Sequence, residues 1–247
     1  MKTTRKFGLI GKNISYSFSK KYFSSKFDNP VFDGFSYENF DIQNIQSFPN
    51  IIKKNADLIG LNITIPYKES VIPFLDSLSK KAKKIGAVNV IKITKKGKIK
   101  GYNSDWYGFL KSIEPLLESH HKKALILGTG GASKAISFAL KKLNIEFLYV
   151  SRTASKRSIE YSNLNAKILN DYQMIINCTP LGTSPRIDLY PAIPFEFITK
   201  NHLVYDLIYN PEKTAFLKKA EDNGAKIKNG YDMLILQAEK AWEIWNR

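Results

Sequence analysis

One segment constrains the fold of this chain more than any other: KALILGTGGASKAISFALKKLNIEFLYVSRT, residues 123–153. A short apolar run is followed at once by Gly128, Gly130 and Gly131, and then by apolar residues at helical spacing. A second apolar run, FLYV, comes next. This order predicts a strand, a glycine-rich turn, a helix and a second strand, which together begin a dinucleotide-binding unit.

The glycine-rich turn is predicted to hold a pyrophosphate. Gly128 permits the tight turn, and Gly130 lets the backbone approach the ligand, whose charge then lies against N–H groups and the positive end of the helix dipole. Ser133 occupies the position where a Rossmann fingerprint usually has glycine or alanine, so the match is a variant. The alternative is a tight strand-to-helix turn that binds nothing.

The end of the second strand indicates which dinucleotide binds. NAD enzymes usually carry Asp or Glu there, because a carboxylate accepts hydrogen bonds from the ribose hydroxyls. Here the chain reads VSRTASKR and contains no acid. Guanidinium and hydroxyl groups bind a 2′-phosphate, whereas a carboxylate repels it. We therefore expect NADP(H) rather than NAD. An ordinary basic loop is the alternative reading for Lys156 and Arg157.

Short apolar runs alternate with helical patterns along the whole chain, which predicts an α/β fold. In the first part we expect strands at 6–11, 34–40 and 56–65, helices at 20–27 and 71–86, and a hairpin over 87–105. In the second part we expect helices at 105–119 and 231–247. We also expect two further strands with turns and a helix in YQMIINCTPLGT and HLVYDLIYNPEKTAFLKKAEDNGAKIKNG. The polar segment SHHKK, residues 119–123, is a candidate boundary.

Composition narrows the functional classes. The net charge of +16 would suit nucleic-acid binding, but the excess is mostly dispersed lysine, with only five arginines. The single cysteine, Cys178, excludes an internal disulfide and fits a reducing cytoplasm. None of the three histidines has metal-ligand spacing, so no metal is expected. No apolar stretch approaches the ~20 residues that cross a bilayer, so no membrane partner is expected.

Several motifs, in one order, resemble those of a known enzyme family. SYSFS, GLNITIPYKE, IGAVNV and GYNSDWYG are followed by GTGGASKA, SRTASK, NCTPLGT, VYDLIYNPEKT and NGYDMLILQA. On these motifs the chain resembles shikimate dehydrogenase, and the similarity runs from about Gly8 to Trp245. The resemblance implies NADPH-dependent, reversible reduction of 3-dehydroshikimate to shikimate, a step of aromatic amino-acid and chorismate biosynthesis.

The resemblance also implies two domains with a cleft between them. Residues 1–104 would form a substrate-binding α/β domain, completed by the C-terminal helix 231–247. Residues 105–230 would form a Rossmann-type NADP-binding domain with a linker helix. The expected partner is the small-molecule substrate, with no nucleic acid, and the expected assembly is a monomer or a homodimer.

The site residues implied by the resemblance form three groups. Lys68 and Asp105 match the catalytic pair, with Lys68 as the acid/base. The substrate contacts are Ser17 and Ser19 for the carboxylate, Thr64, Asn89 and Gln237 for the ring hydroxyls, and Tyr209 beside the substrate. The cofactor contacts are Gly128, Thr129, Gly130, Gly131, Ala132, Ser151, Arg152, Thr153, Lys156, Leu207 and Gly230. A lysine suits this chemistry, because hydride transfer to a ketone leaves negative charge on an oxygen that must also receive a proton.

Each of these residues could instead have a purely structural role. Lys68 could be a surface lysine, Asp105 a helix N-cap, and Ser17 and Ser19 capping serines. Gln237 and Tyr209 could belong to the core. The chain also departs from the family pattern: Tyr16 stands where histidine is common, Lys20 where proline is usual, and Ser151 where asparagine is frequent. Lys156 replaces a frequent arginine, which puts the strength of 2′-phosphate recognition in question, since lysine lacks arginine's planar fork.

Two rival functions stay open on the sequence alone. One is an NAD-preferring quinate/shikimate dehydrogenase, against which the missing acid after LYV argues. The other is a non-catalytic, basic nucleic-acid-binding protein on a dehydrogenase fold, which would bind in a salt-sensitive way. The intact pair of Lys68 and Asp105 argues against it.

Overall fold

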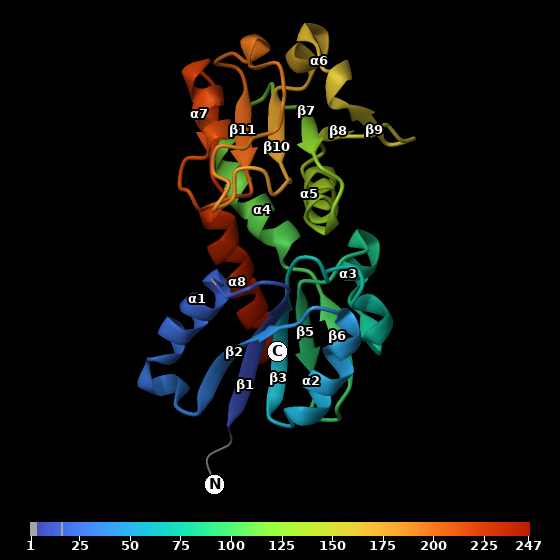
Figure 1. Cartoon of the computed structure of the whole chain (residues 1–247), viewed down its shortest axis with the longest axis vertical. Helices are drawn as coiled ribbons and strands as arrows, with labels where there is room; N and C mark the ends of the chain where they lie inside the picture. Colours follow the sequence, from blue (N-terminus) through green and yellow to red (C-terminus); the bar gives the residue numbers. More distant parts are fainter. Residues whose placement is uncertain (1–3, 16) are drawn as a thin grey trace. The chain divides into compact units, whose positions relative to one another are not determined.

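Two six-stranded sheets organise the chain in the computed structural model (Figure 1). The structure describes residues 4–15 and 17–247, so Tyr16 lies outside the described residues. The chain divides into two units. Unit 1 comprises the residues up to Ser104 together with Ala238–Arg247, and unit 2 comprises Asp105–Gln237.

Unit 1 contains a mixed sheet with the strand order β2, β1, β3, β5, β6, β4. These strands span Phe35–Asp41, Arg5–Gly11, Leu58–Ile63, Val90–Ile93, Ile99–Tyr102 and Ser77–Leu78. β1 runs parallel to β2 and β3, whereas β5 runs antiparallel to β3 and β6, which forms the predicted hairpin. The helices of this unit are α1 (Phe18–Phe27), α2 (Phe48–Lys54), α3 (Lys80–Ile85) and the later part of α8 (Tyr231–Asn246).

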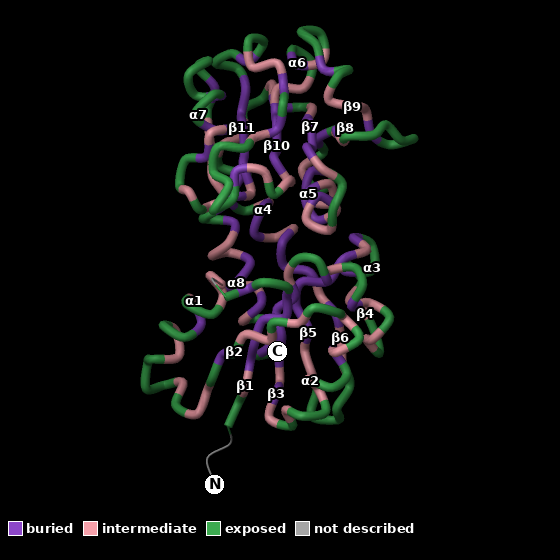
Figure 2. Tube along the Cα trace, viewed as in Figure 1, coloured by how far each residue is buried: buried purple, intermediate pink, exposed green. Residues whose placement is uncertain are grey.

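Apolar side chains fill both faces of the unit 1 sheet, because successive residues of a strand point to opposite sides. Phe7 of β1 packs with Phe23 of α1 and Trp245 of α8 on one face. Ile10 of the same strand packs with Phe48 of α2 on the other face. The middle strands are therefore the buried part of this unit (Figure 2).

Unit 2 contains a parallel sheet with the strand order β12, β11, β10, β7, β8, β9. These strands span Lys226–Lys228, Leu203–Asp206, Met174–Asn177, Lys123–Leu127, Glu146–Ser151 and Ser158–Glu160. Taken along the chain from β7 to β12, the order is that of a Rossmann fold, with a topological switch point between β7 and β10. The glycine-rich segment lies directly after β7, as predicted.

Helices cover both faces of the unit 2 sheet. Ala124 and Ile126 of β7 pack against α4 (Asp105–Ile113) and α5 (Gly131–Lys142). Leu125 and Leu127 pack on the opposite face with α6 (Ala166–Asp171) and α7 (Ala215–Asp222). In the described part of the chain, no helix combines the length and the apolarity that crossing a membrane requires.

Two helices are shorter than the sequence pattern predicts. In 71–86 a 3₁₀ turn and strand β4 precede α3, which begins only where the Ser79 hydroxyl accepts from Ala82 N at 3.2 Å. In 105–119 the α-helix ends at Ile113, and Pro115 lies in a 3₁₀ turn, because proline has no N–H for the helical ladder. Helices α2 and α6 and strands β4, β9 and β12 are additional to the predicted elements.

Candidate functional site

Lys68 lies in the turn after β3, beside two other predicted site residues. Its carbonyl oxygen accepts from Val88 N at 2.7 Å, and Asn89 O accepts from Ile63 N at 2.9 Å. These backbone bonds bring Thr64, Lys68 and Asn89 together at the carboxyl end of β3. The side chains of Thr64 and Lys68 are half-buried and that of Asn89 is buried.

A buried polar network supports this group from within unit 1. The Tyr37 hydroxyl donates to Asn62 Oδ1 at 2.7 Å, and Asn62 Nδ2 donates to Asn89 O at 3.4 Å. Asn89 Nδ2 donates to Ser104 Oγ at 3.0 Å, while Asn89 Oδ1 accepts from Ser104 N at 2.6 Å. Both ends of the Asn89 amide are thus held by Ser104. Burial raises the pKa of Tyr37 well above its ordinary value, so Tyr37 acts as a neutral donor.

The two predicted carboxylate-binding serines lie at the start of α1. Ser17 is the N-cap, and its hydroxyl oxygen accepts from Lys20 N at 3.2 Å. That bond leaves the hydroxyl proton of Ser17 as a donor, so capping is compatible with carboxylate binding. Ser19 is hydrogen bonded to the Tyr37 hydroxyl, which connects α1 to the polar network below Asn89.

The glycine-rich turn joins β7 to α5 at the switch point of the unit 2 sheet. Gly128 has a φ of +99°, and a Cβ added there would lie 3.1 Å from Thr179 Cγ2. Gly130 has an ordinary φ of −77°, and a Cβ added there would have nothing within 4 Å. The fold therefore requires glycine at 128 but not at 130. The open space above Gly130, at the N-terminus of α5, fits a closely bound phosphate group.

Ser133 explains how this turn tolerates a variant fingerprint. Its side chain is fully buried in the first turn of α5, and its hydroxyl donates to Gly130 O at 2.7 Å. A serine at this position therefore stabilises the turn itself.

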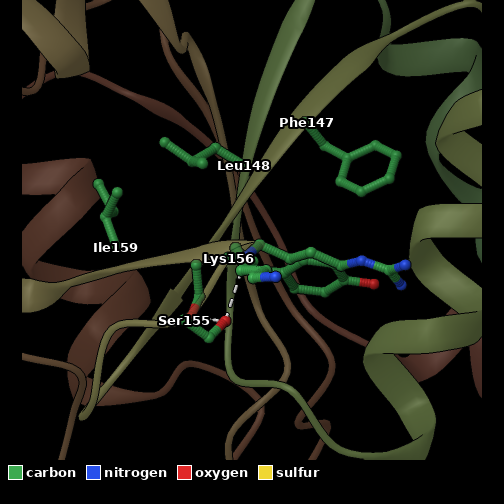
Figure 3. A pocket seen from close by; sticks show the side chains of 8 residues that line it. Phe147, Leu148, Ser155, Lys156 and Ile159 are labelled. Carbon is green, nitrogen blue, oxygen red and sulfur yellow. Dashed lines mark hydrogen bonds between the residues drawn. The ribbon is translucent and has the colours of Figure 1, made fainter.

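The loop between β8 and β9 borders a hollow of about 350 Å³. Figure 3 shows its lining, in which Phe147 and Leu148 come from β8, Ile159 from β9, and Ser155 and Lys156 from the loop. The Ser155 and Ser158 hydroxyl oxygens lie 2.8 Å apart. Ser151, Ser155 and Ser158 are thus linked through their hydroxyl groups.

The basic residues of this loop face solvent. Arg152, Thr153 and Lys156 are exposed, whereas the Ser151 hydroxyl is engaged with Ser158 Oγ at 3.0 Å. A nearby acid, Glu160, accepts from Ala154 N at 3.2 Å and so supports the loop backbone. The exposed guanidinium and ammonium groups make the loop suited to a phosphate ligand.

Asp105 and Gln237 lie on two helices that pack against each other within unit 2. Asp105 is buried in the first turn of α4, where the helix dipole stabilises a carboxylate. One turn later, a Cβ added to Gly108 would lie 2.5 Å from Met233 O and 3.0 Å from Gln237 Cβ. Gln237 is also buried, and its Nε2 donates to Leu234 O at 2.9 Å. Close packing at Gly108 thus fixes α4 against α8.

A buried cluster, formed by Asn177, Asp206 and Thr214, lies at the carboxyl ends of β10 and β11. Asp206 Oδ1 accepts from Asn177 Nδ2 at 3.0 Å and from Ile208 N at 3.1 Å. Asp206 Oδ2 accepts from Thr214 Oγ1 at 2.7 Å. Burial raises the pKa of Asp206 to about 6, although all three bonds favour the charged form.

Three further predicted site residues follow this cluster. Gly230 N donates to Ile208 O at 3.0 Å, and a Cβ added to Gly230 would lie 2.1 Å from Leu207 O. The segment that contains Leu207 and Tyr209 therefore lies directly on the backbone at Gly230. Tyr209 is half-buried, and burial raises the pKa of its hydroxyl.

Comparison with known proteins gives the family. The family model described as the shikimate dehydrogenase substrate binding domain matches residues 9–91. The shikimate dehydrogenase (NADP(+)) of Clostridium botulinum is 39% identical over 96% of this chain and 95% of its own length. This chain belongs to the shikimate dehydrogenase family. The family predicted from the motifs is confirmed.

Solved structures of shikimate dehydrogenases share the whole fold. The enzyme from Aquifex aeolicus is 33% identical with a TM-score of 0.88, covering 100% of this chain and 94% of its own. The Thermus thermophilus enzyme, in complex with NADP(H) and shikimate, is 27% identical with a TM-score of 0.86, covering 98% and 93%. The predicted α/β fold, with a substrate domain and a Rossmann-type domain, is confirmed.

The predicted site residues of this shikimate dehydrogenase family member are divided between the units. Unit 1 carries Ser17, Ser19, Thr64, Lys68 and Asn89, and unit 2 carries the others. Sequence reasoning missed Tyr37, Asn177 and Asp206. The last two each close a short apolar strand, MIIN and LVYD, and a buried polar residue at a strand end is the signal that could have found them.

Proposed function

We propose that this chain catalyses the reversible reduction of 3-dehydroshikimate to shikimate with NADPH, with Lys68 as the acid/base and Asp105 as its partner. Membership of the shikimate dehydrogenase family, at 39% identity over 96% of the chain, carries the proposal. The relatives are shikimate dehydrogenases that use NADP(+), and we infer for this chain the same reaction as a step of aromatic amino-acid biosynthesis. Its enzyme class is therefore an oxidoreductase that acts on a CH–OH group.

Lys68 supplies the proton chemistry. In the reducing direction its ammonium donates a proton to the ketone oxygen and stabilises the negative charge that develops there. In the oxidising direction its neutral amine accepts the proton of the alcohol. Asp105 hydrogen-bonds the same hydroxyl and orients the amine. The half-buried position of Lys68, among Thr64 and Asn89, supports this assignment.

The remaining substrate contacts are those that the family motifs imply. Ser17 and Ser19 donate hydroxyl protons to the substrate carboxylate. Thr64, Asn89 and Gln237 bind the ring hydroxyls, and Tyr209 lies beside the ring. The network of Tyr37, Asn62 and Ser104 supports this hypothesis, because its hydrogen bonds fix the orientation of Asn89 and Ser19.

The dinucleotide binds at the carboxyl edge of the unit 2 sheet. NADPH, when bound, supplies the hydride. Gly128–Ala132 hold its pyrophosphate against the N-terminus of α5, and Leu207 and Gly230 contact the cofactor on the other side of the switch point. Ser151, Arg152, Thr153 and Lys156 take the adenosine 2′-phosphate, which the exposure of the two cations supports.

The domain roles follow from this assignment. We propose that the substrate-binding domain comprises residues 1–104 and the C-terminal helix 231–247, and that the NADP-binding domain comprises residues 105–230. The first part of that helix, up to Gln237, belongs to unit 2 by its contacts. We place the chain in the cytoplasm, which its single cysteine supports. We expect a monomer or a homodimer that binds neither nucleic acid nor membrane.

A spectrophotometric assay tests the proposed function. NADP⁺ reduction at 340 nm is followed with shikimate as the substrate and with quinate and NAD⁺ as the alternatives. We expect the largest kcat/KM for shikimate with NADP⁺. Faster turnover of quinate with NAD⁺ would instead show that the chain is an NAD-preferring quinate/shikimate dehydrogenase. No turnover, together with salt-sensitive binding to DNA, would show that the chain is a non-catalytic nucleic-acid-binding protein.

A further inference from the structure

The cluster of Asn177, Asp206 and Thr214 takes no part in the proposed reaction, yet it joins two loops. Asn177 ends β10, Asp206 ends β11, and Thr214 is the N-cap of α7. All three side chains are fully buried. The carboxylate of Asp206 is the centre of the cluster, since it accepts from Asn177, from Thr214 and from a backbone N–H.

Asn177 extends the cluster into the loop that follows β10. Its Oδ1 accepts from Thr179 N at 2.9 Å and from Thr179 Oγ1 at 2.7 Å. Thr179 Oγ1 in turn accepts from Leu181 N at 3.3 Å. The bond between Asn177 and Asp206 therefore ties residues 178–181 to residues 207–214, the loop that follows β11.

These two loops lie at the half of the sheet that faces the second nucleotide. A Rossmann sheet binds a dinucleotide outside the carboxyl ends of its strands, with one mononucleotide on each half. The half formed by β7, β8 and β9 carries the glycine-rich turn and the basic loop, so it takes the adenosine end. The half formed by β10, β11 and β12 is then left for the nicotinamide end.

A carboxylate is the side chain that this arrangement requires. Every group around Asp206 donates, and only an acceptor can satisfy all three donors at once. Removing the acceptor would leave buried donors unsatisfied, which the loops can relieve only by moving. Any such movement would displace Leu207, whose carbonyl oxygen lies close to Gly230.

We propose that Asp206, together with Asn177, is a positioning residue for the nicotinamide half of the dinucleotide. The pair holds residues 178–181 and 207–214 in the shape that binds this half, and it touches neither the adenosine half nor the substrate. The inference rests on the proposed function, because it takes NADP(H) as the ligand.

Two ligands separate positioning from general stability. NADPH reports on both halves of the site, whereas 2′,5′-ADP reports on the adenosine half alone. For Asp206→Ala we expect the Kd of NADPH to rise about tenfold and kcat to fall, as a small misplacement does. We expect the Kd of 2′,5′-ADP to stay at its wild-type value. Asp222→Ala, at an exposed aspartate at the end of α7, is the matched control and should change neither Kd.

An exchange of the two side chains keeps the test valid if Asp206→Ala does not fold. Asn177→Asp sets two carboxylates against each other and should weaken NADPH binding. Adding Asp206→Asn to that variant restores a donor and an acceptor at the 3.0 Å contact but leaves Ile208 N without its acceptor, so NADPH affinity should recover in part. Thermal unfolding, followed by circular dichroism, gives the folded fraction of each variant.

Specific results would overturn the proposal. One is that Asp206→Ala weakens the binding of NADPH and of 2′,5′-ADP equally. Another is that Asp206→Ala binds NADPH as tightly as the wild type. The third is that NADPH affinity does not recover in the variant with both side chains exchanged. Wild-type protein that neither binds NADPH nor oxidises shikimate would refute the proposed function instead. The two failures are therefore distinguishable.

Discussion

Two glycines in one turn illustrate how single residues separate folding from binding. The backbone conformation at position 128 requires glycine, because residues with a side chain rarely adopt a φ of +99°. Gly130 has no such need, and the space beside its Cα is open. The sequence predicts both as ligand residues, and only the local geometry tells them apart.

Substitution by alanine should separate these two roles. Gly130→Ala should leave the unfolding temperature unchanged but raise the Kd of NADPH about 10- to 100-fold, since its methyl group occupies space that the phosphates need. Gly128→Ala should lower the free energy of unfolding by about 1–2 kcal/mol, because alanine is strained in this conformation. Fluorescence titration and thermal unfolding measure the two effects. If the Gly130→Ala protein binds NADPH normally, the phosphates of NADPH do not bind at this turn.

Arg152 should determine much of the preference for NADP⁺. Its exposed guanidinium can form charge-assisted bonds with a 2′-phosphate that NAD⁺ lacks. Arg152→Ala should raise the KM for NADP⁺ about tenfold and leave the KM for NAD⁺ unaffected. Steady-state assays with both cofactors check this. A parallel rise for NAD⁺ would show that Arg152 supports the loop rather than the phosphate.

At the scale of elements, the close packing of α4 on α8 connects stability to activity. A methyl group at Gly108 would meet the backbone at Met233, which cannot move aside as a flexible side chain would. Gly108→Ala should therefore lower the free energy of unfolding by about 1–3 kcal/mol. It should also lower kcat in folded protein, because Asp105 and Gln237 lie on the two helices. Denaturant unfolding and turnover measure both, and wild-type values in the two would contradict this packing.

The sequence predicted the long elements and missed the short ones for physical reasons. The glycine-rich segment fixes β7, α5 and β8, since a strand, a turn and a helix each leave their own pattern there. Helix α6 and strand β9 are too short for a clear period, and their formation depends on packing against the sheet. The helical pattern at 71–86 was misleading, because Ser77–Leu78 pairs with β6 instead.

The predicted site shows the same limit. Lys68, Asp105 and the glycine-rich turn could be found because a motif surrounds each of them. The hydrogen bond between Asn177 and Asp206 could not, because the two residues are 29 positions apart in the chain. Only the pairing of β10 with β11 brings them together.

At the scale of the whole molecule, buried histidines make stability depend on pH. Burial lowers the pKa of His121 and of His202, so the folded state keeps both neutral. The unfolded chain protonates them below about pH 6.5, so the folded state should lose stability as the pH falls through that value. Asp206 acts in the opposite sense, since its raised pKa makes the folded state bind a proton more readily than the unfolded chain.

A substitution of His202 isolates its contribution to the pH dependence of the free energy of unfolding. The imidazole of His202 bonds to two backbone groups, Leu169 O at 2.9 Å and Thr199 N at 3.0 Å. In His202→Gln, the loss of unfolding free energy between pH 7.5 and pH 5.5 should be smaller than in the wild type. Urea titrations at the two pH values measure it. An unchanged difference would mean that His202 does not titrate on unfolding.

The turnover of Lys68→Ala with shikimate and NADP⁺ is the most direct test of the central claim, that Lys68 is the acid/base of a shikimate dehydrogenase. Lys53→Ala, at an exposed lysine of α2, is the matched control. We predict that kcat falls about 10²–10⁴-fold in Lys68→Ala alone, while the Kd of NADPH and the unfolding temperature stay at wild-type values. Wild-type turnover in folded Lys68→Ala would contradict the account.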